Sequence, residues 1–265
     1  MISELIKTLR FPLMFCIVII HVIAMTESYC FSGNSHWVYF LKVLSPFISL
    51  AVPLFFAISG YLFFNNAETF SATVYKKKLK SRMHSLVIPY FLWSSIFLFI
   101  KIILEAVSPE MLSAGLLSGG IFFVLKSFFV YAPNGTPLVS QFWFLRDLIF
   151  IVFFTPLLYF CFRKMRVFFL VLCSFFFIFA DVLHFPDFIL NYESYLYFFI
   201  FGAYFGIFKK DVLMFLNSKM AKFLTYLFFV VFCLKLFELE FLKFFLESRL
   251  VFLSVFFPEW FLFYA

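Results

Sequence analysis

The sequence predicts an all-α integral membrane protein, a polytopic helical bundle of about eight transmembrane helices with a cytoplasmic N-terminus. Of its 265 residues, 65% are hydrophobic and 13% are charged, and the mean hydropathy is +1.06. A soluble globular domain carries roughly 25% charged residues, so this composition excludes that class. Several apolar runs reach the ~20 residues that a membrane-crossing helix needs, whereas a β-barrel would show short alternating strands. The sequence shows no internal repeat, linker or soluble appendage, so residues 1–265 are expected to form a single membrane domain.

The individual spans are predicted from apolar runs that end at charged or turn residues. A further apolar run, 111–131, contains three glycines and Lys126, and it is predicted to be an interfacial or re-entrant helix. The first run follows Lys7 and Arg10 and has no small-residue cleavage site after it, so it is expected to be an uncleaved signal anchor. The eight predicted spans are 11–27, 37–64, 85–104, 142–162, 166–182, 194–208, 220–236 and 250–265.

Positive charges between the spans predict the orientation, because cytoplasmic loops collect Lys and Arg. With the N-terminus inside, 14 Lys and Arg residues fall in cytoplasmic segments or at the cytoplasmic ends of the adjoining spans, and only Lys126, Lys243 and Arg249 fall outside. A full crossing by 111–131 would move the basic cluster at 163–166 to the outside. The charge distribution therefore argues against that crossing and for a multi-pass protein with a cytoplasmic N-terminus.

Charge and cysteine content limit the partners. Topology signals and contact with anionic lipid headgroups explain the net charge of +7, so no nucleic-acid partner is expected. The five cysteines lie far apart, without C-x-x-C or Cys/His spacing, so no metal or redox site is expected.

The first span contains two ionisable residues, Arg10 and His21. At ~100° and ~1.5 Å per residue, the eleven-residue step between them ends ~20° beyond three full turns and covers ~16 Å. Both therefore share one helix face, and His21 lies near the bilayer centre if Arg10 marks the cytoplasmic boundary. An intramembrane histidine indicates a functional site. The alternative is a histidine that is hydrogen-bonded between helices for packing.

Two segments near the predicted cytoplasmic side are candidates for ligand contact. Ser59 and Gly60 allow close approach of either a ligand or a neighbouring helix, and packing is the commoner reason for such residues. The segment 76–82 contains five basic residues, which suit either nucleotide phosphates or lipid headgroups and topology.

The fourth predicted span begins with Trp143 and Arg146 near the outer face. A guanidinium there can orient a sugar or diphosphate group. Alternatively, Trp143 is an aromatic-belt anchor and Arg146 forms a neutralising pair with Asp147.

Taken together, four stretches resemble the acyltransferase-3 family of polytopic inner-membrane O-acyltransferases. The first is Arg10-x10-His21, and the second is FFAISGY (55–61). The third is the basic segment that leads to LVIPYFLW (86–93), and the fourth is FWFLRDL (142–148) followed by Thr155-Pro156.

This resemblance implies an enzyme that moves an acetyl or other acyl group from cytoplasmic acyl-CoA, usually acetyl-CoA, to a hydroxyl of an envelope polysaccharide or its lipid-linked precursor. Such transfer needs a base and oxyanion donors but no metal and no permanently bound cofactor. His21 would be the base or a transient acyl carrier. Arg10 would bind CoA phosphate or hold the catalytic helix in register. CoA contacts are expected from Ser59, Gly60, Lys77, Lys78, Lys80 and Arg82, and acceptor contacts from Trp143 and Arg146.

Two departures from the family pattern leave alternatives open. Ser85 stands where many relatives have a second arginine, three residues after Arg82. The chain ends inside its eighth predicted span, whereas family members usually have more spans, so the last helices are expected to be lacking. The alternatives are a membrane transporter of acyl groups or lipid-linked glycan that performs no transfer chemistry, and an inactive truncated relative.

Overall fold

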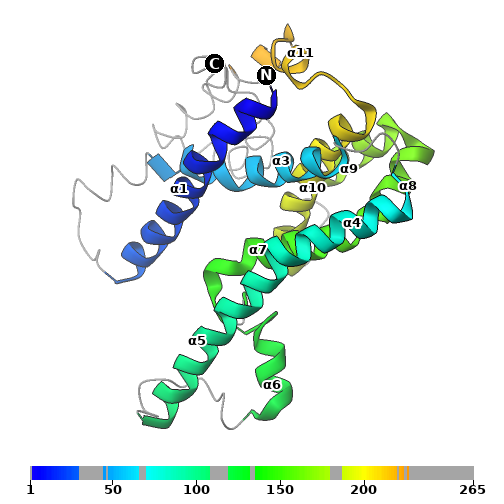
Figure 1. The fold of residues 1–265 in the computed structure, drawn as a ribbon. Helices are drawn as coiled ribbons and strands as arrows, with labels where there is room; N and C mark the ends of the chain where they lie inside the picture. Colours follow the sequence, from blue (N-terminus) through cyan, green and yellow to red (C-terminus); the bar gives the residue numbers. More distant parts are fainter. Residues whose placement is uncertain are drawn as a thin grey trace. The chain divides into compact units, whose positions relative to one another are not determined.

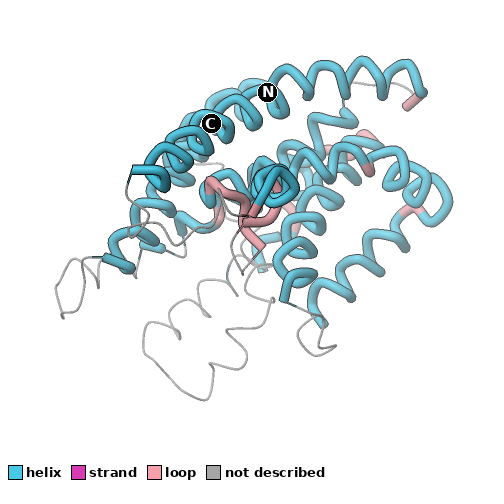
Figure 2. The backbone as a smooth tube through the Cα atoms, turned by 90° about the horizontal axis from the view of Figure 1, so that it is seen from below, coloured by secondary structure: helices cyan, strands magenta, loops and turns pink. Residues whose placement is uncertain are grey.

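A computed structural model describes residues 2–29, 44–45, 47–65, 70–107, 119–131, 135–179, 187–219, 221–223 and 226. All regular structure in these residues is helical, which confirms the all-α prediction (Figures 1 and 2). The chain packs as two compact units, one made of Met1–Glu68 with Cys161–Ala265 and the other of Thr69–Phe160. The single membrane domain over 1–265 stays a prediction.

Each unit is built from a few helices. The first contains α1 (Ile2–Tyr29), α3 (Ala51–Asn65), α9 (Val167–Phe179), α10 (Asp187–Phe208) and the short α11 (Val212–Leu216). The second contains α4 (Ala72–Arg82), the π-helical turn η1 (Met83–Val87), α5 (Ile88–Val107), α6 (Gly120–Ser127), the 3-10 turn η2 (Ser140–Phe142) and α7 (Trp143–Phe153). Helix α8 (Thr155–Met165) begins in the second unit and ends in the first.

Helices α3 and α10 lie side by side in the core of the first unit (Figure 1). A side chain at Gly202 of α10 would overlap the carbonyl of Ala57, and one at Gly206 would overlap the carbonyl of Tyr61. Small residues allow two helix backbones to approach this closely. Because the residue numbers rise together along both helices, α3 and α10 run parallel.

The C-terminal ends of these two helices meet. Lys209 follows α10 with a φ of +51°, and its Nζ donates to the carbonyl of Asn65, the last residue of α3. The N–H of Lys210 donates to the carbonyl of Phe205 at 3.2 Å. A cation at a helix C-terminus is favourable because the last carbonyls carry partial negative charge. Both helices therefore end beside Lys209 and Lys210.

The basic segment 76–82, which lies between two predicted spans, is helical and forms part of α4. Ser71 caps α4 by accepting from the N–H of Val74 at 3.3 Å, and the segment consists largely of good helix formers. Pro89 cannot donate to the carbonyl four residues earlier and its ring crowds that carbonyl. The helix widens there, with the N–H of Ile88 donating to the carbonyl of Met83, and continues through α5.

The predicted span 142–162 is also interrupted. Helices α7 and α8 bend by 57° relative to each other at Phe154. Pro156 removes the hydrogen bond that would reach the carbonyl of Val152, and the Thr155 hydroxyl donates to that carbonyl instead at 2.7 Å. The bend therefore has a local cause in the Thr-Pro pair.

Three described helices are long and apolar enough to cross a membrane, namely those containing Ile6–Ile23, Phe47–Asn65 and Ala72–Val107, and a fourth follows if the bent α7–α8 pair counts as one span. The apolar parts of α9 and α10, Val167–Phe177 and Tyr195–Phe208, are shorter. These helices overlap six of the predicted spans. The predicted spans 220–236, apart from a few residues, and 250–265 lie outside the described residues. The total of eight stays a prediction.

Candidate functional site

Arg10 and His21 lie on one uninterrupted helix, α1. The buried side of α1 carries Ile6, Leu13 and Ile17, and at ~100° per residue Arg10 and His21 lie on that same side. Arg10 is exposed and His21 is half-buried. No described residue forms a hydrogen bond with the imidazole of His21, and the packing alternative stays open. The role of His21 as base stays a prediction.

Ser59 and Gly60 lie on α3, which packs against both α1 and α10. Ser59 is buried, and the face of Gly60 is covered by the backbone of Phe199 and Ala203. For Gly60, helix packing explains why a residue without a side chain stands there. CoA binding by Ser59 and Gly60 stays a prediction.

The basic residues of α4 divide between two sides of the helix. Lys76, Lys77 and Lys80 are exposed, whereas Lys78 and Arg82, one turn apart, are half-buried. At ~100° per residue these two groups face different directions. The four α4 residues predicted to bind CoA, Lys77, Lys78, Lys80 and Arg82, therefore differ in direction and exposure, and CoA binding by them stays a prediction.

Aromatic contacts hold α4 within the second unit. The Tyr75 hydroxyl donates to the carbonyl of Phe153 at 3.1 Å, and the ring of Phe70 lies 4.7 Å from that of Tyr159. Beyond α4, Nδ1 of the exposed His84 lies 2.9 Å from the carbonyl of Lys80. These contacts leave the Lys76–Lys77–Lys80 side of α4 uncovered.

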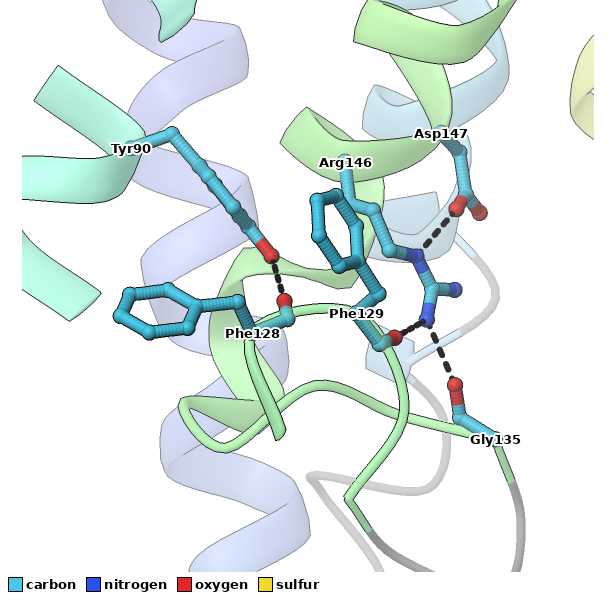
Figure 3. A network of polar contacts seen from close by, with 6 residues as sticks. All are labelled: Tyr90, Phe128, Phe129, Gly135, Arg146 and Asp147. Carbon is cyan, nitrogen blue, oxygen red and sulfur yellow. Dashed lines mark hydrogen bonds and ion pairs between the residues drawn. The ribbon is translucent and has the colours of Figure 1, made fainter. Parts of the chain in front are cut away.

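Arg146 is the centre of a buried polar network in the second unit (Figure 3). Its Nε donates to the Asp147 carboxylate at 2.8 Å, and its Nη1 donates to the carbonyls of Phe129 and Gly135, each at 2.5 Å. Only 5% of Arg146 and 3% of Asp147 are exposed. The neutralising pair with Asp147 is thus present, and the guanidinium points into the protein. Acceptor binding by Arg146 stays a prediction.

A second polar contact lies beside this network. The buried Tyr90 of α5 donates its hydroxyl to the carbonyl of Phe128, the residue that follows α6 (Figure 3). Trp143, at the start of α7, is half-buried and its ring centroid lies 6.2 Å from that of Phe144. Sequence reasoning missed both Tyr90 and Gly135. A signal for Gly135 was present, because Asn-Gly between prolines is typical of a turn with positive φ, and Gly135 has a φ of +78°.

The predicted residues divide between the two units. Arg10, His21, Ser59 and Gly60 belong to the first unit, whereas the residues of α4 and α7 belong to the second. Within the part of the chain that the structure describes, no group of three or more His, Cys, Asp or Glu side chains could hold a metal ion.

Comparison with known proteins gives one family match and one similar protein. A model of the acyltransferase-3 family, described as an acyltransferase domain, matches residues 5–264. The chain is also 29% identical over 161 residues to the succinoglycan biosynthesis protein ExoH of Rhizobium meliloti (strain 1021). That match covers 59% of this chain and 42% of the relative, so it spans less than half of the relative's length. No solved structure matches.

Proposed function

The chain belongs to the acyltransferase-3 family, and on that premise we propose that it is a multi-pass O-acyltransferase of the cell inner membrane. Its donor is cytoplasmic acyl-CoA, with an acetyl group as the expected cargo. Its acceptor is a hydroxyl of a cell-envelope polysaccharide or of the lipid-linked precursor. The observation that carries the proposal is the family match over residues 5–264, and the name of the relative, a succinoglycan biosynthesis protein, supports a glycan acceptor.

The proposed topology has a cytoplasmic N-terminus. The parallel packing of α3 and α10 supports the predicted order of spans, because an odd number of crossings must separate two parallel spans. Three predicted spans, 85–104, 142–162 and 166–182, lie between them. A full crossing by 111–131 would make α10 antiparallel to α3. Lys209 and Lys210, at the shared end, agree with the cytoplasmic side.

The proposed chemistry uses His21 as general base. The acceptor hydroxyl oxygen bonds to the acyl carbonyl carbon while its proton passes to the imidazole, the thioester C–S bond breaks, and the proton then passes to the CoA thiolate. His21 is half-buried, so part of this residue stays exposed on α1. The second route, with His21 as transient acyl carrier, stays open.

The donor binds beside cationic groups in this proposal. Arg10 on α1 and the exposed Lys76, Lys77 and Lys80 on α4 are positive groups that a CoA phosphate can reach from water. The alternative role of Arg10, holding α1 in register, stays open. No metal takes part, because base and thioester already supply the proton acceptor and the leaving group.

The test is acetylation in membranes that contain either the wild-type chain or His21→Ala, measured by mass spectrometry of the envelope glycan. Wild-type membranes are expected to add acetyl groups and His21→Ala membranes to lose about 100-fold or more in rate. Val22→Ala, an exposed neighbour on α1, is the matched control and should retain the rate. Unchanged acetylation in His21→Ala would remove His21 as base. No acetyl difference between membranes with and without the wild-type chain would reject the enzyme.

A further inference from the structure

The 128–142 connection between α6 and α7 is described at residues 128–131 and 135–142, where several backbone polar groups are paired within the protein. Among its described residues, the N–H of Tyr131 donates to the carbonyl of Thr136 at 2.8 Å, and the N–H of Leu138 donates to the carbonyl of Ser127 at 2.8 Å. A backbone polar group that is buried away from water costs free energy unless it is hydrogen-bonded. These two bonds therefore hold the described residues that leave α6 against those that lead to α7.

Arg146 joins the two sides of this connection. Its Nη1 donates both to Phe129, on the side that leaves α6, and to Gly135, on the side that returns to α7. Charge-assisted bonds of this kind are stronger than those between neutral groups. Asp147 supplies the opposite charge that a buried guanidinium needs.

Two contacts from α5 hold the same connection from another side. The Tyr90 hydroxyl donates to the carbonyl of Phe128, and the Lys101 ammonium lies 4.7 Å from the ring centroid of Tyr131. The connection ends with η2 and leads directly into Trp143. The position of the connection therefore influences the position of Trp143, the first residue of α7.

We infer that Arg146 is a positioning residue that holds the 128–142 connection, and through it Trp143, in place, and that it does not contact the acceptor. In its effect on transfer this inference rests on the proposed function. An acceptor could reach the guanidinium only after the bonds to Phe129 and Gly135 had broken. The buried geometry in Figure 3 thus assigns a different role from the acceptor contact that the sequence predicts for this arginine.

The first arm of the test measures cysteine labelling and needs no transfer activity. Val139→Cys tests a buried residue of the connection and Ser140→Cys an exposed one, each placed in a variant in which alanine replaces all five native cysteines. With Arg146 present, Val139→Cys should resist a maleimide and Ser140→Cys should react. Adding Arg146→Ala should speed labelling of Val139→Cys about threefold or more and leave Ser140→Cys unchanged. Arg163→Ala, which removes an exposed arginine, is the control and should change neither.

Unchanged protection of Val139→Cys in folded Arg146→Ala protein would overturn the inference. If that variant does not elute as a folded protein, Arg146→Lys replaces it, because one ammonium cannot serve Asp147 and both carbonyls together. About twofold faster labelling is then expected, and full protection overturns the inference.

The second arm compares kinetics of Arg146→Lys and Gly135→Ala. A Cβ at Gly135 meets no atom within 4 Å, so Gly135→Ala strains only the backbone at its positive φ and leaves the arginine side chain intact. If Arg146 acts through the connection, both variants change acceptor KM and kcat in the same direction. A raised acceptor KM in Arg146→Lys alone would instead show direct contact and reject the inference. If Arg146→Ala speeds the labelling of Val139→Cys as expected but the wild-type chain transfers no acyl group, only the proposed function is rejected.

Discussion

Gly60 of α3 lies directly against the backbone carbonyl of Phe199 of α10, so closely that any side chain at position 60 would overlap it. Gly202 stands in the same relation to Ala57. The two helices therefore meet backbone to backbone at reciprocal positions. This close contact fixes their parallel register, which no apolar run in the sequence specifies.

The first prediction follows from this contact. Gly60→Ala should destabilise the protein by about 1–3 kcal/mol, because the added methyl must push α3 away from α10. The thermal midpoint of the detergent-solubilised protein, followed by size-exclusion fluorescence, should fall. Ser95→Thr, which adds one methyl at an exposed position of α5, is the control and should leave the midpoint unchanged. An unchanged midpoint in Gly60→Ala would mean that the two backbones are further apart than the structure has them.

The second prediction concerns topology. Reporter fusions after Asn65 and after Lys210 should lie in the same compartment, because α3 and α10 are parallel and end together. The proposed orientation makes this the cytoplasm, so green fluorescent protein should fluoresce at both points. Alkaline phosphatase should be active in fusions after Val107 and after Val130, since α6, with eight residues, is too short to cross. Opposite compartments for the latter two fusions would show that the chain crosses between them.

The sequence predicts apolar runs well and polar tertiary contacts poorly, for a physical reason. Six predicted spans overlap described helices, because crossing a bilayer demands a length and a composition that can be read directly. The partners of Arg146 are backbone carbonyls 17 and 11 residues away. Every residue has a carbonyl, so no residue type marks those partners in advance. The pairing with the adjacent Asp147 was foreseeable, and the direction of the guanidinium was not.

Helix boundaries show a related limit. The predicted span 85–104 begins after the basic segment because that segment is charged. The segment is nevertheless helical, because the Ser71 cap and the good helix formers of α4 act locally. The interruption at Phe154 depends on Pro156, which stands inside a run that is apolar on both sides. Hydropathy therefore located the spans, and local backbone chemistry decided where the helices bend and end.

The third prediction separates the two sides of α4. Neutralising Lys76, Lys77 and Lys80 together should raise the KM for acetyl-CoA several-fold with little change in kcat, because these exposed cations can attract CoA phosphates. Higher salt should reduce the difference from the wild type. Neutralising the half-buried Lys78 and Arg82 should instead lower the amount of folded protein.

Lys164→Ala, at an exposed basic position at the end of α8, is the control for the loss of charge alone. It should leave the KM for acetyl-CoA unchanged. If the Lys76, Lys77 and Lys80 variant changes only membrane orientation, the basic segment serves topology and lipid contact.

The last prediction concerns the bend between α7 and α8. The Thr155 hydroxyl is fully buried and donates to the Val152 carbonyl that Pro156 leaves without its usual donor. Thr155→Val keeps the shape but leaves this carbonyl unsatisfied, which should cost about 1–3 kcal/mol. Thr155→Ser keeps the donor and should lose less stability, so the difference in thermal midpoint between the two variants measures the hydrogen bond. Equal midpoints would show that the carbonyl finds another donor, and the bend would then depend on Pro156 alone.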